Sequence, residues 1–278
     1  MMARKILAEF TVTPALAGKT GAAVLKEELK LSARQRQKVI RTGGLKVDGR
    51  VIHSNSRLKE GQLVQVSLPA EEQVKVKARP LPLEIIYEDD ALLVVNKPAG
   101  VIVHHVKPNQ NQVSLVEGAA YYLQQQGRVI TPRPVHRLDR GTSGIVVFAK
   151  SAQIQQLLAE AWPEVTKIYL ARVHGTVKQG GEITTPIKGK PARTKYTPIA
   201  AADGTTTLEV QIFTGRTHQI RIHLAQLGHP VVGDYLYNKK DDQSCRQRLA
   251  LHCWKLCLNH PVTGESLQLI APASDLDF

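Results

Sequence analysis

The stretch His136–Lys150, HRLDRGTSGIVVFAK, joins a charged loop directly to an apolar run. Residues 145–149 are continuously apolar with two β-branched valines in the middle, which is typical of a strand buried on both faces. In the loop, Gly141 and Gly144 permit backbone conformations that are closed to other residues, and the hydroxyls of residues 142–143 can hydrogen-bond the neighbouring backbone. The stretch therefore predicts a fixed loop anchored to a buried strand.

One carboxylate, Asp139, stands in this loop between Arg137 and Arg140. A carboxylate held beside a buried strand is a candidate for chemistry. The alternative is that Asp139 caps the turn or forms a surface ion pair with one of the two arginines. The loop alone leaves both interpretations open, and two further segments bear on the choice.

The first of these segments is Lys167–Gly175, KIYLARVHG, which alternates in the manner of a strand. The alternation places Tyr169, Ala171 and Val173 on one face. The small Ala171 leaves room beside the Tyr169 ring.

The second segment is Thr214–Tyr237, TGRTHQIRIHLAQLGHPVVGDYLY, which follows a predicted strand at residues 208–213. Apolar residues recur at helical spacing and a glycine follows, so we expect a helix over 217–227 with a stripe of Ile220, Leu224 and Leu227 and a stop at Gly228.

Arg221 lies off the apolar stripe of this helix, among His218, Thr217 and Ala225 one turn away. This mixed polar and small surface suits a cleft. A buried arginine needs a carboxylate partner, and Asp139 is the best candidate.

The motifs HRLDRGTSG, KIYLA and GRTHQIRIHLAQLGHPVVGD, preceded by NKPAGVIVH at residues 96–104, follow one another along the chain. They resemble the RluA/RluD family of RNA pseudouridine synthases over roughly residues 83–275. By this resemblance Asp139 matches the catalytic aspartate, Tyr169 the active-site tyrosine, and Arg221 the arginine that pairs with the aspartate. Arg140 matches an arginine associated with rearrangement of the RNA.

The resemblance implies that uridine is isomerised to pseudouridine: the bond from the base nitrogen to the ribose breaks, the base turns over, and a bond to carbon 5 forms. No redox change occurs, so no cofactor is expected. Asp139 could attack the ribose or the base as a nucleophile, or take a proton from the ribose, while Arg221 would keep it ionised and oriented. Because a base inside a duplex is out of reach, the target must be flipped out or presented in a loop.

Composition agrees with an RNA partner. The 278 residues include 37 Lys and Arg against 24 Asp and Glu, a formal net charge of +13, for which a polyanion is the natural partner. Aromatic residues are only 5%, so we expect phosphate contacts and shape to dominate recognition. Without a long apolar stretch or a secretory leader, we expect a soluble, cytoplasmic, monomeric protein with no membrane partner.

Neither the cysteines nor the histidines form a metal-binding pattern. Cys245, Cys253 and Cys257 lack the paired spacing of a zinc site, so buried reduced thiols are expected. The histidines include no HExxH motif, and no metal is expected. His104 and His105 instead follow the NKPAG turn and are expected to line the cleft.

Residues 12–68 read as a separate basic unit. We expect helices over 20–30 and 32–41, with Ser32 as N-cap and residues 43–44 as the stop, then strands over 45–52 and 62–68 with a tight turn at residues 48–49. The segment RQRQKVIRTGGLKVDGRVI resembles the alpha-L RNA-binding motif of a small-subunit ribosomal protein. The candidate RNA contacts of this unit are Lys26, Arg34, Lys38 and Arg41. Residues 69–82 read as a linker.

Residues 83–275 are expected to form an α+β catalytic domain. The resemblance implies a mixed, mostly antiparallel sheet with the cleft across its middle. Strands are predicted at 83–87, 92–96, 145–149, 168–174, 196–200, 208–213 and 266–270, and helices at 113–125, 153–160 and 217–227. Residues 178–191 read as an exposed loop that could touch RNA.

Candidate RNA contacts in this domain are His136, Arg137, Arg140, Arg216 and His218. The layout resembles enzymes that act on large-subunit ribosomal RNA. Two alternatives are a synthase that acts on transfer RNA and a non-catalytic RNA-binding assembly factor on the same scaffold. Binding alone does not require an aspartate in an anionic ligand's site, so Asp139 favours an enzyme.

Overall fold

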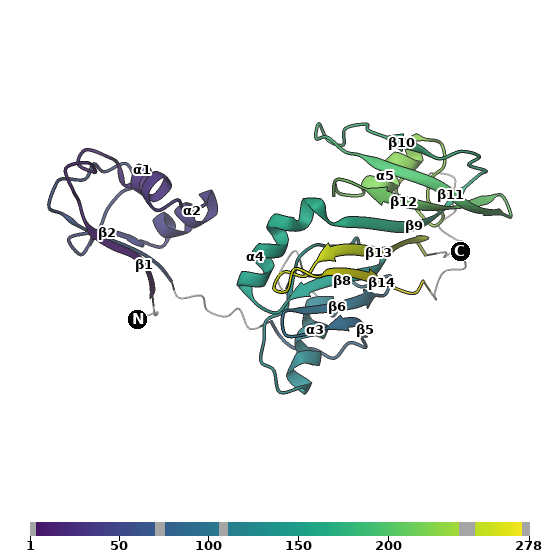
Figure 1. The fold of residues 1–278 in the computed structure, drawn as a ribbon, viewed down its shortest axis with the longest axis horizontal. Helices are drawn as coiled ribbons and strands as arrows, with labels where there is room; N and C mark the ends of the chain where they lie inside the picture. Colours follow the sequence, from purple (N-terminus) through teal and green to yellow (C-terminus); the bar gives the residue numbers. More distant parts are fainter. Residues whose placement is uncertain (1–3, 70–75, 106–110, 239–247, 274–278) are drawn as a thin grey trace. The chain divides into compact units, whose positions relative to one another are not determined.

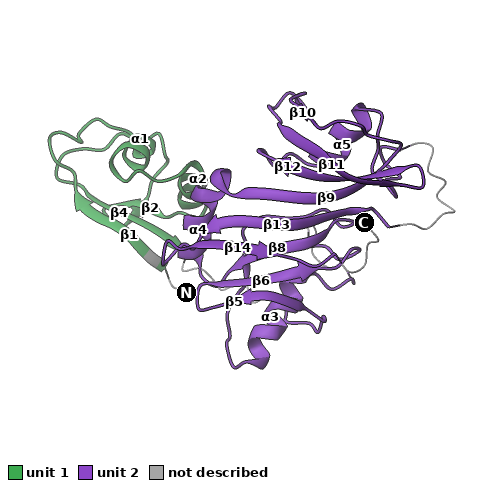
Figure 2. Cartoon of the chain, turned by 45° about the vertical axis from the view of Figure 1, so that its right-hand side comes forward, with its two compact units in different colours: residues 1–75 green, residues 76–278 purple. Residues whose placement is uncertain are grey.

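The structure of the chain is a computed structural model that describes residues 4–69, 76–105, 111–238 and 248–273. It contains two compact units, Met1–Lys75 (unit 1) and Val76–Phe278 (unit 2), shown in Figure 2. Each unit has its own apolar core. Among the described residues, no helix has both the length and the apolar character needed to cross a membrane.

Unit 1 contains a four-stranded sheet in the order β1 (Arg4–Thr11), β4 (Leu63–Pro69), β2 (Leu45–Val47), β3 (Arg50–Val51). The predicted strand 45–52 is a hairpin, in which Asp48 and Gly49 both adopt positive φ (48° and 78°) at the predicted tight turn. The sequence did not indicate β1, which extends the sheet ahead of residue 12 by pairing antiparallel with β4.

Two helical segments pack on this sheet. The first predicted helix consists of α1 (Gly21–Ala23), which continues as a π-helical turn, η1 (Val24–Glu28). The second is α2 (Ala33–Arg41), which begins at the predicted Ser32 cap: its hydroxyl accepts from the Gln35 amide and the Gln35 side chain accepts from the Ser32 amide. Gly43, at φ +63°, follows its end.

Unit 2 is built on a ten-stranded sheet whose main path runs β10-β11-β12-β9-β13-β8-β6-β5, with β14 on β13 and β7 on β8 (Figure 1). Of the strand pairs in the described residues, only β8–β13 is parallel, so the predicted mixed, mostly antiparallel α+β fold is confirmed. The strands are β5 (Glu84–Glu88), β6 (Leu92–Lys97), β7 (Arg133–Pro134), β8 (Ser143–Ala149), β9 (Thr166–His174), β10 (Gly181–Ile183), β11 (Thr194–Ala202), β12 (Thr205–Ile212), β13 (Leu251–Asn259) and β14 (Ser266–Ile270).

The centre of this sheet carries the two strands that the sequence marked most clearly. Every residue of β8 is buried. In β9 burial alternates, and Tyr169, Ala171 and Val173 share the buried face as predicted. Between them lies β13, the apolar run around Cys253 that the sequence did not identify as a strand. Cys253 is buried and Cys257 partly buried; both are free thiols, and Cys245 lies outside the described residues.

The helices of unit 2 are α3 (Leu115–Gln125), α4 (Ala152–Ala161), the short 3₁₀ turn η2 (Trp162–Glu164) and α5 (Gln219–Gln226). On α3, a Cβ at Gly118 would lie 2.7 Å from the Leu81 side chain. Leu81 thus packs against α3, so the last residues of the predicted linker belong to the packed part of unit 2. The predicted loop 178–191 is also partly ordered, since it contains β10 and a bridge between Ile187 and Lys190.

Helix α5 is shorter than the predicted 217–227. Ile220 and Leu224 are buried, but Leu227 is 38% exposed and does not continue the apolar stripe. Gly228, two residues after the last residue of the helix, adopts φ +86° as expected for a glycine stop.

Candidate active site

The loop that carries Asp139 is held by the backbone on both sides. The Thr142 amide donates to the Asp139 carbonyl (3.1 Å), closing a turn. The Arg140 carbonyl accepts from the Gly100 amide (2.8 Å), and the Arg140 Nε donates to the Gly100 carbonyl (3.0 Å). The turn of the NKPAG motif and the Asp139 loop, far apart in sequence, are therefore joined directly.

Lys97, which the sequence analysis did not single out, lies beneath this junction with no exposed surface. Its Nζ donates to the carbonyls of Pro98 (2.9 Å), Val101 (2.8 Å) and Arg140 (3.3 Å). Burial lowers the pKa of Lys97 to about 7, against the opposing attraction of Asp139. The feature of the sequence that could have identified Lys97 is its position at the end of an apolar strand, directly before a turn.

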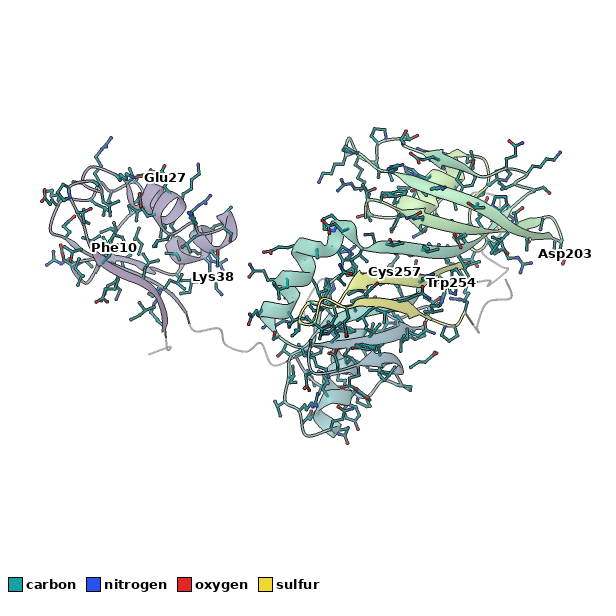
Figure 3. All side chains as sticks on the ribbon, viewed as in Figure 1. Phe10, Glu27, Lys38, Asp203, Trp254 and Cys257 are labelled. Carbon is teal, nitrogen blue, oxygen red and sulfur yellow. The ribbon has the colours of Figure 1, made fainter. Side chains whose placement is uncertain are left out.

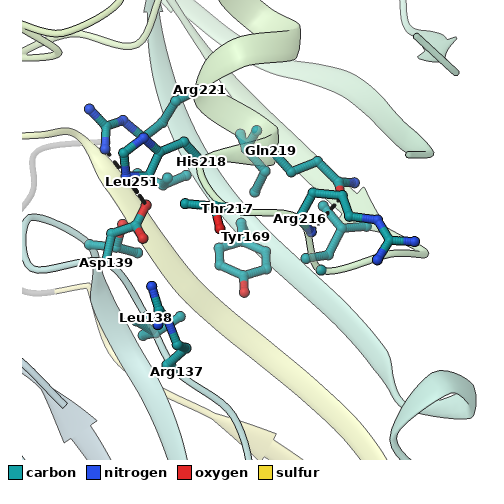
Figure 4. A pocket seen from close by; sticks show the side chains of 14 residues that line it. Arg137, Leu138, Asp139, Tyr169, Arg216, Thr217, His218, Gln219, Arg221 and Leu251 are labelled. Atoms are coloured by element: carbon teal, nitrogen blue, oxygen red, sulfur yellow. Dashed lines mark hydrogen bonds and ion pairs between the residues drawn. The ribbon is translucent and has the colours of Figure 1, made fainter. Parts of the chain in front are cut away.

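A cavity of about 310 Å³ opens in front of Asp139 near the middle of the sheet (Figure 4), where the resemblance placed the cleft. We call it the Asp139 cavity. Its walls combine apolar side chains with arginines and one carboxylate. The lining residues are Arg137, Leu138, Asp139, Thr142, Tyr169, Ile212, Gly215, Arg216, Thr217, His218, Gln219, Ile220, Arg221 and Leu251.

Arg221 faces two carboxylates, and the closer one is not Asp139. Its Nε and Nη2 donate to Asp234 Oδ2 and Oδ1 at 2.7 and 2.8 Å, a bidentate pair in which Asp234 is completely buried. Its Nη1 lies 3.6 Å from Asp139 Oδ2. The predicted pairing of Arg221 with Asp139 is thus present as an ion pair, but the two hydrogen bonds of the guanidinium go to Asp234, a second partner that the sequence did not indicate.

Asp234 is also fixed from the other side. Its Oδ1 accepts from the amides of Leu236 (3.1 Å) and Tyr237 (3.2 Å). Burial alone would raise the pKa of Asp234, but the Arg221 hydrogen bonds, the ion pair and these amides lower it below its usual value. A single aspartate in the apolar run VVGDYLY was the signal that could have identified it.

His218 approaches Asp139 from a strained backbone position. It precedes α5 with φ +56°, a left-handed conformation that is uncommon for a residue other than glycine. Its Nδ1 lies 2.9 Å from the Tyr237 hydroxyl, and its Nε2 lies 3.7 Å from Asp139 Oδ2. The Arg221 guanidinium in turn lies 5.2 Å from the centre of the Tyr237 ring. The side chains of His218 and Arg221 thus both approach the same oxygen of Asp139, Oδ2.

Tyr169 forms another wall of the same cavity, as Figure 4 shows. It is 8% exposed and pairs across the sheet with Cys253 of β13. Burial, the neighbouring Cys253 thiol and the charge of Asp139 raise the pKa of Tyr169 well above 10. Its hydroxyl is therefore protonated at neutral pH.

The predicted RNA contacts of unit 2 fall in different places. Arg137, Arg216 and His218 line the Asp139 cavity, and Arg140 lies beside Asp139 in an adjoining hollow that His104 also lines. His136 instead stacks on Trp162, and its Nε2 accepts from the Val147 amide (3.2 Å). His105 is not among the residues that line these cavities; its Nε2 lies 2.9 Å from Glu117 on α3.

The predicted RNA contacts of unit 1 lie on its helices. Lys26 belongs to η1, and Arg34, Lys38 and Arg41 belong to α2; Figure 3 labels Lys38. Lys26 and Arg41 are exposed and Lys38 is partly buried. That these residues contact RNA stays a prediction.

Known proteins share both the sequence and the fold. A family model described as RNA pseudouridylate synthase matches residues 91–226. The ribosomal large subunit pseudouridine synthase D of Xanthomonas campestris pv. campestris is 34% identical over 97% of this chain and 90% of its own length. An uncharacterized RNA pseudouridine synthase of Aquifex aeolicus is 36% identical, covering 82% of each chain.

Among solved structures, human RNA pseudouridylate synthase domain containing 1 superposes with a TM-score of 0.58 at 27% identity, covering 70% of this chain and 85% of that one. The relatives share most of their length with this chain, and the matched region contains Asp139, Tyr169 and Arg221. The chain therefore belongs to the RluA/RluD family of RNA pseudouridine synthases, the isomerases that convert uridine in RNA to pseudouridine.

Proposed function

We propose that this enzyme converts specific uridines of large-subunit ribosomal RNA to pseudouridine and that Asp139 is its catalytic carboxylate. One observation carries the assignment of Asp139: its side chain is 22% exposed in the cavity, while the neighbouring Arg221 is held in place by the buried Asp234. A carboxylate that only capped a turn would not need an arginine supported by a second carboxylate.

Asp139 would act on a uridine seated in the cavity. In the reaction the bond between N1 and the ribose C1′ breaks, C5 bonds to C1′, C5 loses its proton and N1 gains one. An ionised carboxylate can attack the ribose or the base, or take a proton from the ribose. Because Arg221 and His218 both lie within 4 Å of the same Asp139 oxygen, they would hold the other oxygen toward the substrate.

Tyr169 would serve as a stacking surface for the uracil. Its ring forms a wall of the cavity, and base stacking on an aromatic ring contributes about 1–3 kcal/mol. Because its hydroxyl is protonated at neutral pH, Tyr169 in its resting form cannot take the proton from C5. That proton would then pass to another group, for which Asp139 is the carboxylate among the described residues that line the cavity.

The ribosomal RNA target is supported by two observations. Relatives from Xanthomonas campestris and Haemophilus ducreyi, at 34% and 31% identity, are ribosomal large subunit pseudouridine synthases D. Unit 1 also carries a basic helical surface of the kind that binds structured RNA. We further propose that the enzyme acts as a monomer.

The test compares wild type with Asp139→Asn. The variant keeps the size of the side chain but cannot act as an anion, so it should form no pseudouridine while keeping its fold and RNA affinity. Pseudouridines would be mapped across ribosomal and transfer RNA from cells carrying either gene, with purified proteins assayed on the RNA identified. Turnover by Asp139→Asn would refute the assignment of Asp139, and sites lost from transfer RNA alone would refute the ribosomal target.

A further inference from the structure

A second cavity of about 460 Å³ adjoins the Asp139 cavity. The two share five lining residues: Arg137, Tyr169, Ile212, Gly215 and Arg216. Tyr169 is thus a wall of both. At Gly215, which lines both, an added Cβ would find no atom within 4 Å. Nothing in the conversion of a single uridine uses this second space.

Aromatic side chains surround the second cavity. Trp162 lines it and stacks on His136 with ring centroids 4.6 Å apart and planes 22° from parallel. Phe213 lines it from the end of β12 and is 36% exposed. Tyr169 and Phe213 are large flat rings against which a nucleobase can stack, whereas Trp162 is already stacked on His136 and has the Lys167 Nζ 5.8 Å from its ring centre. Their concentration here contrasts with the low aromatic content of the whole chain.

Positive charge lies at the edge of this aromatic space. Arg137 is exposed and Arg216 half-buried; both line the two cavities, and the Arg216 Nε donates to the Pro191 carbonyl (2.9 Å). Arg193 lies with its guanidinium 4.2 Å from the Phe213 ring centre, held by two hydrogen bonds to Glu182 (2.8 and 2.9 Å). None of the described residues that line the second cavity is acidic. An aromatic interior with an arginine rim fits a base and its phosphate.

We propose that the second cavity binds the base of the nucleotide next to the target uridine in the same RNA strand. The inference rests on the proposed function, because it takes the Asp139 cavity to hold the target. The five shared lining residues and the open space at Gly215 favour a neighbour on the same strand over a separate ligand. Tyr169 then lies between two bases, so the RNA must be unstacked at two successive positions and not only at the converted one.

The first experiment removes the neighbouring base and leaves the RNA backbone intact. A stem-loop RNA containing the uridine that wild type converts is made with an abasic nucleotide on the 5′ side, on the 3′ side, or at a loop position two or more nucleotides away. Binding is measured with Asp139→Asn, so that the RNA is not converted. One of the two adjacent abasic sites should weaken binding about tenfold or more, as expected for a lost base–aromatic stack, and the distant one should not.

The second experiment fills the cavity. Ala159 lines it from the exposed face of α4, outside the Asp139 cavity, so Ala159→Phe should occupy the space without touching the catalytic groups. This variant should raise KM on the intact RNA and lose that effect on the RNA with the sensitive abasic site. Ala159→Ser, which adds little volume, is the matched control and should behave like wild type on both RNAs.

The inference is overturned if neither adjacent abasic site weakens binding, or if Ala159→Phe impairs the intact and abasic RNAs equally. Should Ala159→Phe not fold, the abasic series decides on its own. Failure of the proposed function looks different: wild type would then convert no uridine in ribosomal RNA, and no stem-loop could be chosen for either experiment.

Discussion

Arg221 stands between two carboxylates of unequal burial. Asp234 has no exposed side-chain surface and takes two short hydrogen bonds, whereas Asp139 is 22% exposed and 3.6 Å away. The buried partner therefore sets the orientation of the guanidinium, and Asp139 keeps its lone pairs for substrate. Replacing Asp234 and Asp139 one at a time is the most direct test of these two roles, the orientation of Arg221 and the contact with substrate.

Replacing Asp234 by Asn should be more damaging to the fold than replacing Asp139. Asp234→Asn leaves the largely buried Arg221 charge without its bidentate anion, so we expect a loss of about 3–5 kcal/mol in unfolding free energy, together with a lower kcat. Asp139→Asn should lose turnover but stay within about 1 kcal/mol of wild-type stability, because its contact is longer and partly solvated.

Denaturant unfolding and single-turnover assays of both variants measure the difference. Wild-type stability and turnover in Asp234→Asn would mean that Arg221 does not depend on this partner. A loss of several kcal/mol in Asp139→Asn would transfer the structural role to Asp139.

His136 predicts a pH dependence of stability. Burial lowers the pKa of His136 to about 3, consistent with its Nε2 accepting a hydrogen bond from the Val147 amide. In the unfolded chain the pKa is about 6.5. Between these values the unfolded state binds a proton that the folded state does not, so stability is complete above about pH 6.5 and falls as the pH drops toward 3.

His136→Phe keeps a ring against Trp162 but cannot titrate. From pH 6.5 to 5, wild type should lose up to about 2 kcal/mol more unfolding free energy than this variant. Chemical denaturation at pH 5, 6 and 7.5 provides the comparison. Parallel stability curves for the two proteins would show that His136 does not titrate differently in the folded state.

Among the elements of unit 2, the parallel contact of β8 with β13 places the Asp139 loop against the centre of the sheet. The contact is short, pairing Ser143 with His252 and Gly144 with Cys253. The Ser143 hydroxyl lies 2.7 Å from His252 Nδ1, which strengthens the same junction. Gly144, at φ +110°, lets the two backbones approach closely, since a Cβ there would lie 2.6 Å from the Cys253 nitrogen.

Gly144→Ala should therefore separate β8 from β13. We expect a loss of roughly 2–4 kcal/mol in unfolding free energy and a displaced Asp139 loop with little turnover. Gly264→Ala is the matched control: φ is also positive (+76°), but no atom lies within 4 Å of the added Cβ, so the cost should be about 1 kcal/mol with turnover retained. Denaturation midpoints and conversion assays measure both. Equal effects of the two changes would mean that backbone conformation alone explains the need for glycine at residue 144.

For the whole molecule, the chain forms two units with separate cores, and we expect unit 1 to place the RNA and unit 2 to carry the chemistry. Unit 1 has its own core, formed by residues such as Val24, Leu25 and Val64, while every residue that lines the Asp139 cavity belongs to unit 2. Unit 1 also carries twice as many Lys and Arg as Asp and Glu. Its contribution should thus be electrostatic affinity for RNA.

Removing residues 1–75 should weaken RNA binding and reduce its dependence on salt, because each lost phosphate contact lowers the slope of log K against log salt by about one. Turnover at saturating enzyme should survive in part. Filter binding from low to high salt and single-turnover conversion are the measurements. A truncated protein that folds but converts no RNA would show that unit 1 helps to build the active site.

Local sequence patterns determined the elements whose signals lie within a few residues. Continuous hydrophobicity marked β8, alternation marked β9, and glycine stops and a capping serine marked the ends of α5 and α2. The same patterns selected Asp139, Tyr169 and Arg221, which the fold brings to one cavity. In each case the deciding interaction is a short-range one, such as a cap, a turn, or burial of one face.

Only the tertiary structure decided which groups those residues meet. Arg221 pairs with Asp139, as the sequence indicated, but its hydrogen bonds go to Asp234, thirteen residues away around the turn after α5. β13 enters the centre of the sheet from more than 100 residues beyond β8, and Lys97 reaches the carbonyl of Arg140 from β6. Pairing of this kind depends on strand order and on competition among several carboxylates for one buried arginine, and neither is encoded in the spacing of residues along the chain.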